Sequence, residues 1–273
     1  KEPDVVQPFE KCSKYIDPQL PEKLKELEIT KLITVDKTMD QMDADFISRL
    51  ERVCPVLVID HHKLYHDHDS PSFTMVKPHL IWKTEPSSFP TGMFAFTLFS
   101  CICDLGDKEW IPCVAITSDN AYSRWKSFVD ESLQKQQLAP VSKDPYEAAY
   151  GIMARMIYAT QILAPYQMPE FLDMMVDASH PNEILDSGFN QLLKIVEEEV
   201  DSWLVHVKVH MEHYPELELH IARVNPRHAI KSLLINKISN EWYPKESVLL
   251  MQDLGRERVL ISARRQDFKV PMN

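Results

Sequence analysis

The segment Val56-Leu57-Val58-Ile59-Asp60-His61-His62 carries the strongest fold signal, because an apolar run delivers an aspartate and two histidines at its end. Four successive β-branched or leucine residues are typical of a strand buried on both faces, as in parallel sheets. The polar triplet then lies at the carboxyl end of that strand, where open α/β sheets place their ligands. The sequence therefore predicts an α/β fold with a candidate site at residues 60–62.

Two further apolar runs also end in an aspartate. One is Leu32-Ile33-Thr34-Val35 before Asp36, and a weaker one is Cys113-Val114-Ala115-Ile116-Thr117 before Ser118 and Asp119. We predict a strand for each run, so that all three polar ends meet at one sheet edge. Carboxylate and imidazole ligands together suit Mn²⁺, Mg²⁺, Fe²⁺ or Zn²⁺.

These residues resemble the motifs of the DHH phosphoesterase family, whose members include RecJ-type exonucleases, oligoribonucleases and family II pyrophosphatases. Asp36 matches the aspartate of the second motif, and Asp60, His61 and His62 match the third. Asp119 matches the aspartate of the fourth motif. The resemblance covers most of the chain and implies a metal-dependent phosphoesterase.

The resemblance also implies a role for each matched residue. It implies two divalent cations, Mn²⁺ first and Mg²⁺ as the alternative, with Asp36, His61 and Asp119 as metal ligands and Asp36 bridging both ions. His62 would face the substrate phosphate, and Asp60 would orient a histidine from behind, so these two form the expected catalytic pair. His66 and His68, in the loop that follows, are interpreted as solvated.

The resemblance leaves two motifs without a match. The first motif of the family, a histidine followed by two aspartates, has no counterpart in residues 1–35. The Gly-Gly-His loop expected near the C-terminus is also missing before Asn273. We therefore expect both ends to be incomplete, with residues 1–9 forming the second strand of the fold.

Pattern changes along the chain predict three parts. Residues 1–140 are expected to form the DHH domain, residues 141–205 a helical linker, and residues 206–273 a smaller α/β domain that resembles DHHA1. The last part reads as strand, helix, strand and strand, at 217–222, 229–242, 247–251 and 258–262. The active site is expected in the cleft between the two domains.

Three residues are candidates for holding the substrate. Arg264 and Arg265 follow a predicted strand in the smaller domain, and arginine matches phosphate with a planar fork. Ser88 precedes an apolar helix predicted at 93–103, whose N-terminus could hold a phosphate. The alternative is that the serine and threonine residues at 87–91 only cap this helix.

Composition narrows the possible functions. The net charge is −11, from 30 basic and 41 acidic residues, which disfavours a generic basic nucleic-acid coat. Five glycines leave no Gly-rich phosphate loop, which excludes P-loop and Rossmann fingerprints.

The sequence has no apolar run long enough for a membrane span. Five cysteines without zinc spacing indicate reduced thiols and a cytoplasmic protein, with Cys101 and Cys103 in a helix core.

Three functions remain open. The first is a RecJ-like exonuclease that acts on single-stranded DNA or RNA ends, or on short oligonucleotides, in DNA repair. The second is a catalytically weakened scaffold that binds protein partners in a replication or repair complex. The third is a small-molecule phosphoesterase that hydrolyses a cyclic dinucleotide or pyrophosphate.

Overall fold

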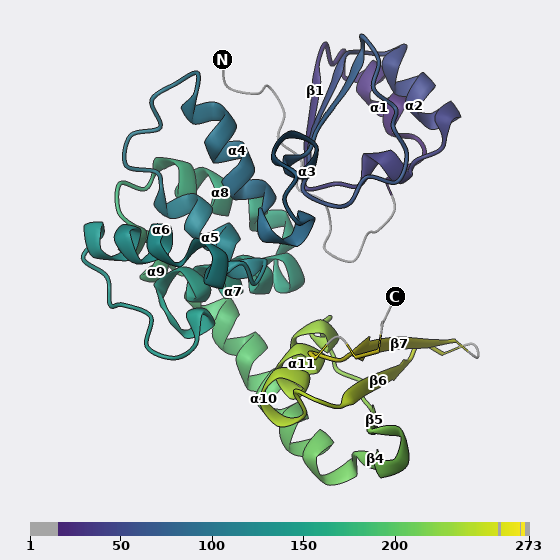
Figure 1. Cartoon of the computed structure of the whole chain (residues 1–273), viewed down its shortest axis with the longest axis vertical. Helices are drawn as coiled ribbons and strands as arrows, with labels where there is room; N and C mark the ends of the chain where they lie inside the picture. The colour runs from purple at the N-terminus through teal and green to yellow at the C-terminus, as the bar shows by residue number, and fades with distance from the viewer. Residues whose placement is uncertain (1–15, 256–257, 268, 271–273) are drawn as a thin grey trace. The chain divides into compact units, whose positions relative to one another are not determined.

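The chain folds into two compact units in the computed structural model, which describes residues 16–255, 258–267 and 269–270. Of these residues, the first unit contains 16–157 and 169–187, and the second contains 158–168 and those from 188 onward (Figure 1). The strand expected at residues 1–9 lies outside the described residues. The helices of the predicted linker, residues 141–205, are divided between the two units.

A three-stranded parallel sheet organises the start of the first unit, in the order β1 (Leu32–Val35), β2 (Val56–Ile59) and β3 (Phe73–Val76). The strands predicted before Asp36 and Asp60 are therefore confirmed. The third neighbour, β3, was not predicted from the sequence. Because helix α2 (Ala44–Glu51) joins β1 to β2 and the sheet is parallel, the fold is α/β, as expected.

Helices α1 (Leu20–Glu26) and α2 (Ala44–Glu51) accompany this sheet. The Asp43 side chain begins α2 by accepting a hydrogen bond from the Phe46 backbone N–H at 2.7 Å. Apolar side chains of α2, including Phe46 and Leu50, are buried in one cluster with Val58 and Phe73. This cluster fixes the sheet and therefore the position of the strand ends.

The remaining elements of the first unit are helical. They are α3 (Pro78–Trp82), α4 (Thr91–Ser100), α5 (Trp110–Ser118), α6 (Tyr122–Lys135), α7 (Ala149–Leu163), whose last residues belong to the second unit, α8 (Met168–Asp177) and α9 (Pro181–Leu185).

The strand predicted at 113–117 is wrong, because these residues form helix α5. The helix is buried nearly all round, so its sequence lacks the polar face that would have identified it. Pro112 lies in the first turn, where its missing N–H costs no helical hydrogen bond. The β-branched Thr117 satisfies its hydroxyl by donating to the Cys113 carbonyl at 2.9 Å.

The prediction that Cys101 and Cys103 belong to the core of a helix is also wrong. Helix α4 ends at Ser100, and both cysteines are exposed after it. Their thiols lie near carbonyls of the preceding turn and contribute no buried surface.

The second unit contains a four-stranded sheet in the order β4-β5-β6-β7. Its elements are α10 (Asn190–His210), β4 (Glu212–Tyr214), β5 (Leu219–Arg223), α11 (Lys231–Lys237), a π-helical turn (Ile238–Trp242), β6 (Ser247–Asp253) and β7 (Val259–Arg264). Strands β5 and β6 are parallel, and the outer pairs are antiparallel. The strand-helix-strand-strand prediction is confirmed, whereas β4 was not predicted.

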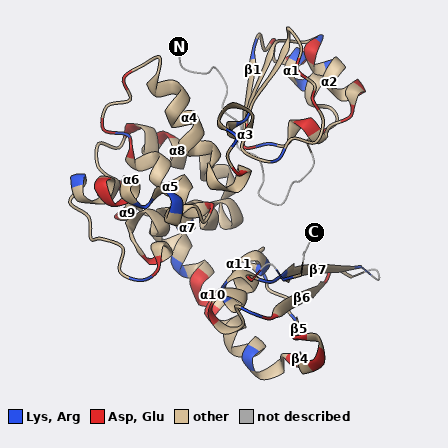
Figure 2. Ribbon diagram, in the orientation of Figure 1, with Lys and Arg blue, Asp and Glu red and all other residues tan. Residues whose placement is uncertain are grey.

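Acidic residues lie on helices of both units, for example on α2 and α10 (Figure 2). Among the residues that the structure describes, no helix combines the length and apolar character needed to cross a membrane.

Candidate active site

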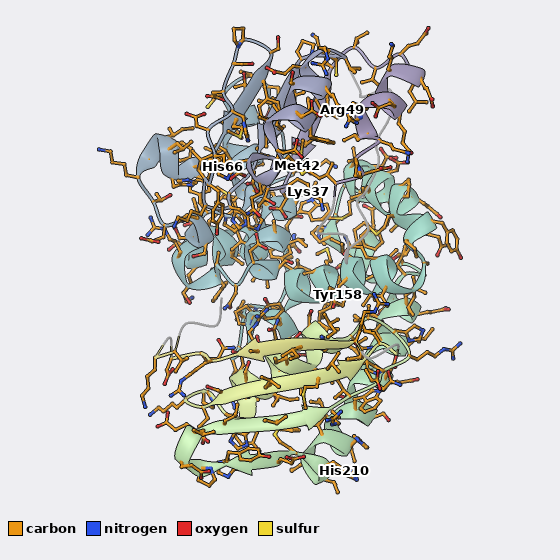
Figure 3. The ribbon with its side chains drawn as sticks, turned by 90° about the vertical axis from the view of Figure 1, so that its right-hand side faces the viewer. Lys37, Met42, Arg49, His66, Tyr158 and His210 are labelled. Atoms are coloured by element: carbon orange, nitrogen blue, oxygen red, sulfur yellow. The ribbon has the colours of Figure 1, made fainter. Side chains whose placement is uncertain are left out.

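Asp36 follows β1 at the carboxyl edge of the parallel sheet. Its backbone N–H donates to the Ile59 carbonyl at 2.9 Å, so Asp36 remains tied to the end of β2. Its φ of 57° is left-handed, a conformation that aspartate tolerates better than most residues. The turn ends the strand there, before Lys37 (labelled in Figure 3), and leaves the carboxylate half-exposed.

His61 follows β2 and lies between two carboxylates. Its Nε2 is 3.7 Å from Asp36 Oδ1 and 4.0 Å from Asp119 Oδ2, and its side chain is 12% exposed. Two ligands each about 2.1 Å from one ion lie about 3–4.2 Å apart. The distance from His61 to each carboxylate therefore fits a pair of ligands on one metal ion.

Asp119 reaches this group from the end of a helix. Asn120, at φ 57°, ends α5 in a Schellman motif, in which the Ala121 N–H donates to the Ile116 carbonyl at 2.9 Å. Burial of the carboxyl group and the nearby charge of Asp36 raise the pKa of Asp119 to about 6, although His61 opposes this rise. The two carboxylates beside one imidazole therefore concentrate negative charge, which a bound cation would offset.

Close contact between α4 and α5 supports this arrangement. A Cβ atom added to Gly92 would lie 2.5 Å from the Ala115 Cβ, so only glycine allows the helices to approach this closely. Thr91 begins α4, and Asp119 follows α5. The contact therefore couples two segments of the site.

Thr91 joins the two strand ends. Its hydroxyl donates to Asp36 Oδ1 at 2.7 Å and accepts a hydrogen bond from the His61 backbone N–H at 3.2 Å. The N-cap of α4 is Pro90, without a side-chain capping bond, so the capping alternative for Thr91 is wrong. Sequence reasoning missed this role, although a threonine at a helix start was its signal.

A buried ion network lies behind the motif. Asp40, Asp60 and Lys77 are each fully buried, and the Lys77 ammonium contacts both carboxylates. The same ammonium donates to the His62 carbonyl at 2.9 Å. Asp40 also accepts from the Tyr65 backbone N–H at 2.8 Å. Sequence reasoning missed both Asp40 and Lys77. The one signal for them was the position of Lys77 directly after β3.

This network sets the charge of Asp60 and His62. Burial alone would raise the pKa of Asp60, but hydrogen bonds from His62 and Lys77 outweigh it and hold that pKa well below its ordinary range. The His62 Nδ1 is 2.7 Å from Asp60 Oδ1, and this bond raises the pKa of the imidazole. His62 is 47% exposed, so the ring whose protonated form this bond favours is accessible from solvent.

The structure brings four of the predicted site residues together. Ligand atoms of Asp36, His61 and His62 lie within 4.8 Å of one another, and Asp119 approaches His61. Carboxylate oxygens mixed with imidazole nitrogens form a donor set that fits a divalent transition metal such as Mn²⁺. Asp60 lies behind this group, bonded to His62.

The three predicted substrate-binding residues lie elsewhere in the chain. The Ser88 hydroxyl donates to the Glu85 carbonyl at 2.7 Å in the turn before α4. Arg264 ends β7 in the second unit and donates to Asn236 Oδ1 at 3.2 Å. Arg265 is buried, and its guanidinium is bonded to Glu218 and Asp267.

Comparisons with known proteins rest on structure alone. No protein-family model matches the sequence, and no curated protein matches it. One solved structure with a similar fold is a DHH domain from a protein described as a member of a family of ribosomal proteins. Its TM-score is 0.60 at 14% identity, and the match covers 85% of this chain and 56% of that one.

A second similar structure is exonuclease RecJ bound to manganese. The TM-score is 0.57 at 17% identity, and the match covers 87% of this chain and 64% of RecJ. The chain therefore spans less than two thirds of either protein. Both matches extend over the two units described above, and together they show that this chain has the DHH-type, RecJ-like fold.

Proposed function

We propose that the protein is a divalent-metal-dependent phosphodiester hydrolase that acts on single-stranded nucleic acid ends or short oligonucleotides. The observation that carries the proposal is the convergence of Asp36, His61, His62 and Asp119 at one edge of a parallel sheet. The exonuclease activity and manganese named for RecJ agree with it.

Asp36, His61 and Asp119 would hold the divalent metal, with Mn²⁺ as the expected ion. When bound, such ions polarise phosphate oxygens and lower the pKa of a bound water. Thr91 fixes the orientation of the Asp36 carboxylate, because its hydroxyl occupies Oδ1. This would direct the remaining lone pairs of that carboxylate to the ions.

His62 would bind the phosphate directly. Its hydrogen bond to Asp60 favours the protonated ring, which can donate to a phosphate oxygen as negative charge develops there. Lys77 keeps Asp60 ionised and in place. Asp60 and Lys77 are thus positioning residues for His62.

An aromatic hollow supports a nucleic-acid substrate. Trp82, Phe89 and Trp125 line it together with Arg124, and Phe89 is two residues before Thr91. Trp82 is 44% exposed and stacks on Phe89 with ring centroids 5.0 Å apart. Such faces stack bases without sequence preference, each worth about 1–3 kcal/mol.

In the second unit, Arg264 is the candidate phosphate anchor. Its hydrogen-bond acceptors, Asn236 and the Ala263 carbonyl, carry no charge, whereas Arg265 is neutralised by two carboxylates. We therefore expect Arg264→Ala to raise KM for an oligonucleotide and leave Mn²⁺ affinity unchanged. Arg265→Ala should instead lower stability, because it removes the buried guanidinium that bonds both Glu218 and Asp267.

Hydrolysis of end-labelled single-stranded DNA and RNA oligonucleotides tests the function. We expect turnover in Mn²⁺ and loss of turnover in EDTA. Turnover should fall more than about 100-fold in His61→Ala, because replacing even a residue that only hydrogen-bonds a metal ligand lowers activity about 10–100-fold. His66→Ala is the matched control, because His66 is an exposed histidine of the following loop.

Near wild-type turnover of folded His61→Ala in Mn²⁺ would contradict the assignment. If the wild-type protein binds Mn²⁺ but hydrolyses no oligonucleotide, then a cyclic dinucleotide and pyrophosphate are the next substrates. If the protein hydrolyses none of these substrates, the scaffold function remains.

A further inference from the structure

Three potential metal ligands meet on the sheet of the second unit. His213 on β4 and His220 on β5 are direct partners in the antiparallel pair. Glu246 comes immediately before β6, which pairs with β5 on its other side. The strand order β4-β5-β6 therefore gathers residues that are 33 positions apart at the extremes.

The donor atoms of these residues converge. Glu246 Oε2 is 2.9 Å from His220 Nε2 and 3.3 Å from His213 Nε2. The two imidazole rings are stacked in parallel, with an interplanar angle of 1° and centroids 4.3 Å apart, so the exposed His213 ring would turn for both in-plane nitrogen lone pairs to meet one ion. All three ligand atoms lie within 4.8 Å of one another.

One side of this group is buried in the protein, and the other side is open to solvent. His220 is 5% exposed and is backed by Tyr243, whose ring centroid lies 3.6 Å away. His213 is 46% exposed. An ion could therefore enter from the His213 side and keep a water as a further ligand.

We propose that His213, His220 and Glu246 bind a Zn²⁺ ion. Two imidazoles and one carboxylate with an open position form a known zinc ligand set, and tetrahedral ligands about 2.1 Å from zinc lie about 3.4 Å apart. A competing arrangement uses the same atoms without metal, because one carboxylate can accept hydrogen bonds from two imidazoles.

The ion would fasten a weakly held strand. The three residues of β4 are all exposed, so this edge strand gains little from apolar burial. Zinc would join β4 to the β5–β6 pair through side chains of all three segments. Because a ligand that binds only the folded state stabilises it, added Zn²⁺ should raise the melting temperature.

Zinc binding to the full chain tests this inference, measured by competition with a chromophoric zinc indicator. All measurements use the His61→Ala background, which removes a ligand of the other site, so the result is independent of the proposed hydrolase function. Glu246→Gln is compared with Glu212→Gln, a matched control on β4 whose carboxylate bonds the Tyr214 hydroxyl at 2.6 Å. His213→Ala is compared with His210→Ala, an exposed histidine at the end of α10 (Figure 3).

We expect the background protein to bind Zn²⁺, with affinity falling more than about 100-fold in Glu246→Gln and His213→Ala. Both controls should keep the affinity and the zinc-dependent rise in melting temperature. Equal zinc affinity in each matched pair, or no zinc binding by the background protein, would overturn the proposal in favour of the metal-free hydrogen bonds. If Glu246→Gln fails to fold, the half-exposed His213 pair decides.

Discussion

The two histidine–carboxylate clusters of this protein are built in different ways. In the first unit, Asp36 and Asp119 lie at chain turns, and a buried lysine stands behind the motif. In the second unit, His213 and His220 occupy ordinary positions of paired strands and stack on each other. The first cluster therefore depends on special backbone conformations and charge compensation, whereas the second depends on regular sheet pairing.

The largest expected difference concerns buried lysines. Lys77→Met should cost about 3–5 kcal/mol of stability in the first unit, because it leaves the buried carboxylates of Asp40 and Asp60 without their cation. Lys231→Met is the matched control in the second unit, since Lys231 is also buried but donates to the Leu260 carbonyl at 3.1 Å. Native-state hydrogen exchange of β2 and β6 amides measures both losses. Equal losses would remove charge compensation as a difference between the clusters.

The next effect concerns the orientation of Asp36, a proposed metal ligand. Thr91→Val keeps the side-chain shape but loses the hydrogen bond to Asp36, so Mn²⁺ affinity or turnover should fall about 10–100-fold. Thr91→Ser keeps the hydroxyl and should retain most of both. Manganese titration followed by electron paramagnetic resonance, together with oligonucleotide turnover, checks this. Unchanged values for folded Thr91→Val would mean that Asp36 needs no orienting partner.

A smaller effect tests the backbone. Asn120→Ala places a residue with a Cβ and no local hydrogen-bonding side chain at φ 57°, which should cost about 1 kcal/mol. Asn120→Gly should be tolerated, since glycine is the usual residue at this place in a Schellman motif. Thermal unfolding compares the two variants. If the alanine variant were as stable as the glycine variant, the left-handed turn would not limit stability here.

The smallest effect is a difference in titration. The bond to Asp60 raises the pKa of His62 above 6.5, whereas burial lowers the pKa of His220 below it. His62 thus stabilises the fold at low pH, and this contribution is lost as pH rises through its raised pKa. His220 acts oppositely, because its burial costs stability as pH falls below 6.5. Imidazole NMR titration of metal-free protein measures both midpoints, and coincident midpoints would contradict the contrast.

Much of the first cluster is predictable because its signals are local. Asp36 and Asp60 each directly follow an apolar strand, and His61 comes next after Asp60, so sequence alone places them at one sheet edge. The family resemblance grouped Asp119 with these residues, and its carboxylate does lie 4.0 Å from His61, but the sequence assigned it to the wrong element. Its helix is apolar on all sides, and periodicity cannot distinguish such a helix from a buried strand.

The supporting residues are not predictable in this way. Lys77 is 17 residues from Asp60 and 37 from Asp40, and nothing in the sequence reports that the three side chains are buried together. The same holds for His213, His220 and Glu246, because β4 was not recognised and their grouping depends on strand order. Contacts between distant segments, which determine both groups, require the structure.

The internal ammonium of Lys77 has a practical consequence for handling the protein. Because the Lys77 ammonium belongs to the chain itself, Asp60 keeps a cationic partner whether or not a divalent ion is bound. If the proposed ions bind at Asp36, His61 and Asp119, we expect a chelator to remove them without unfolding the protein. A spectroscopic ion should then replace a silent one at the sheet edge without a refolding step.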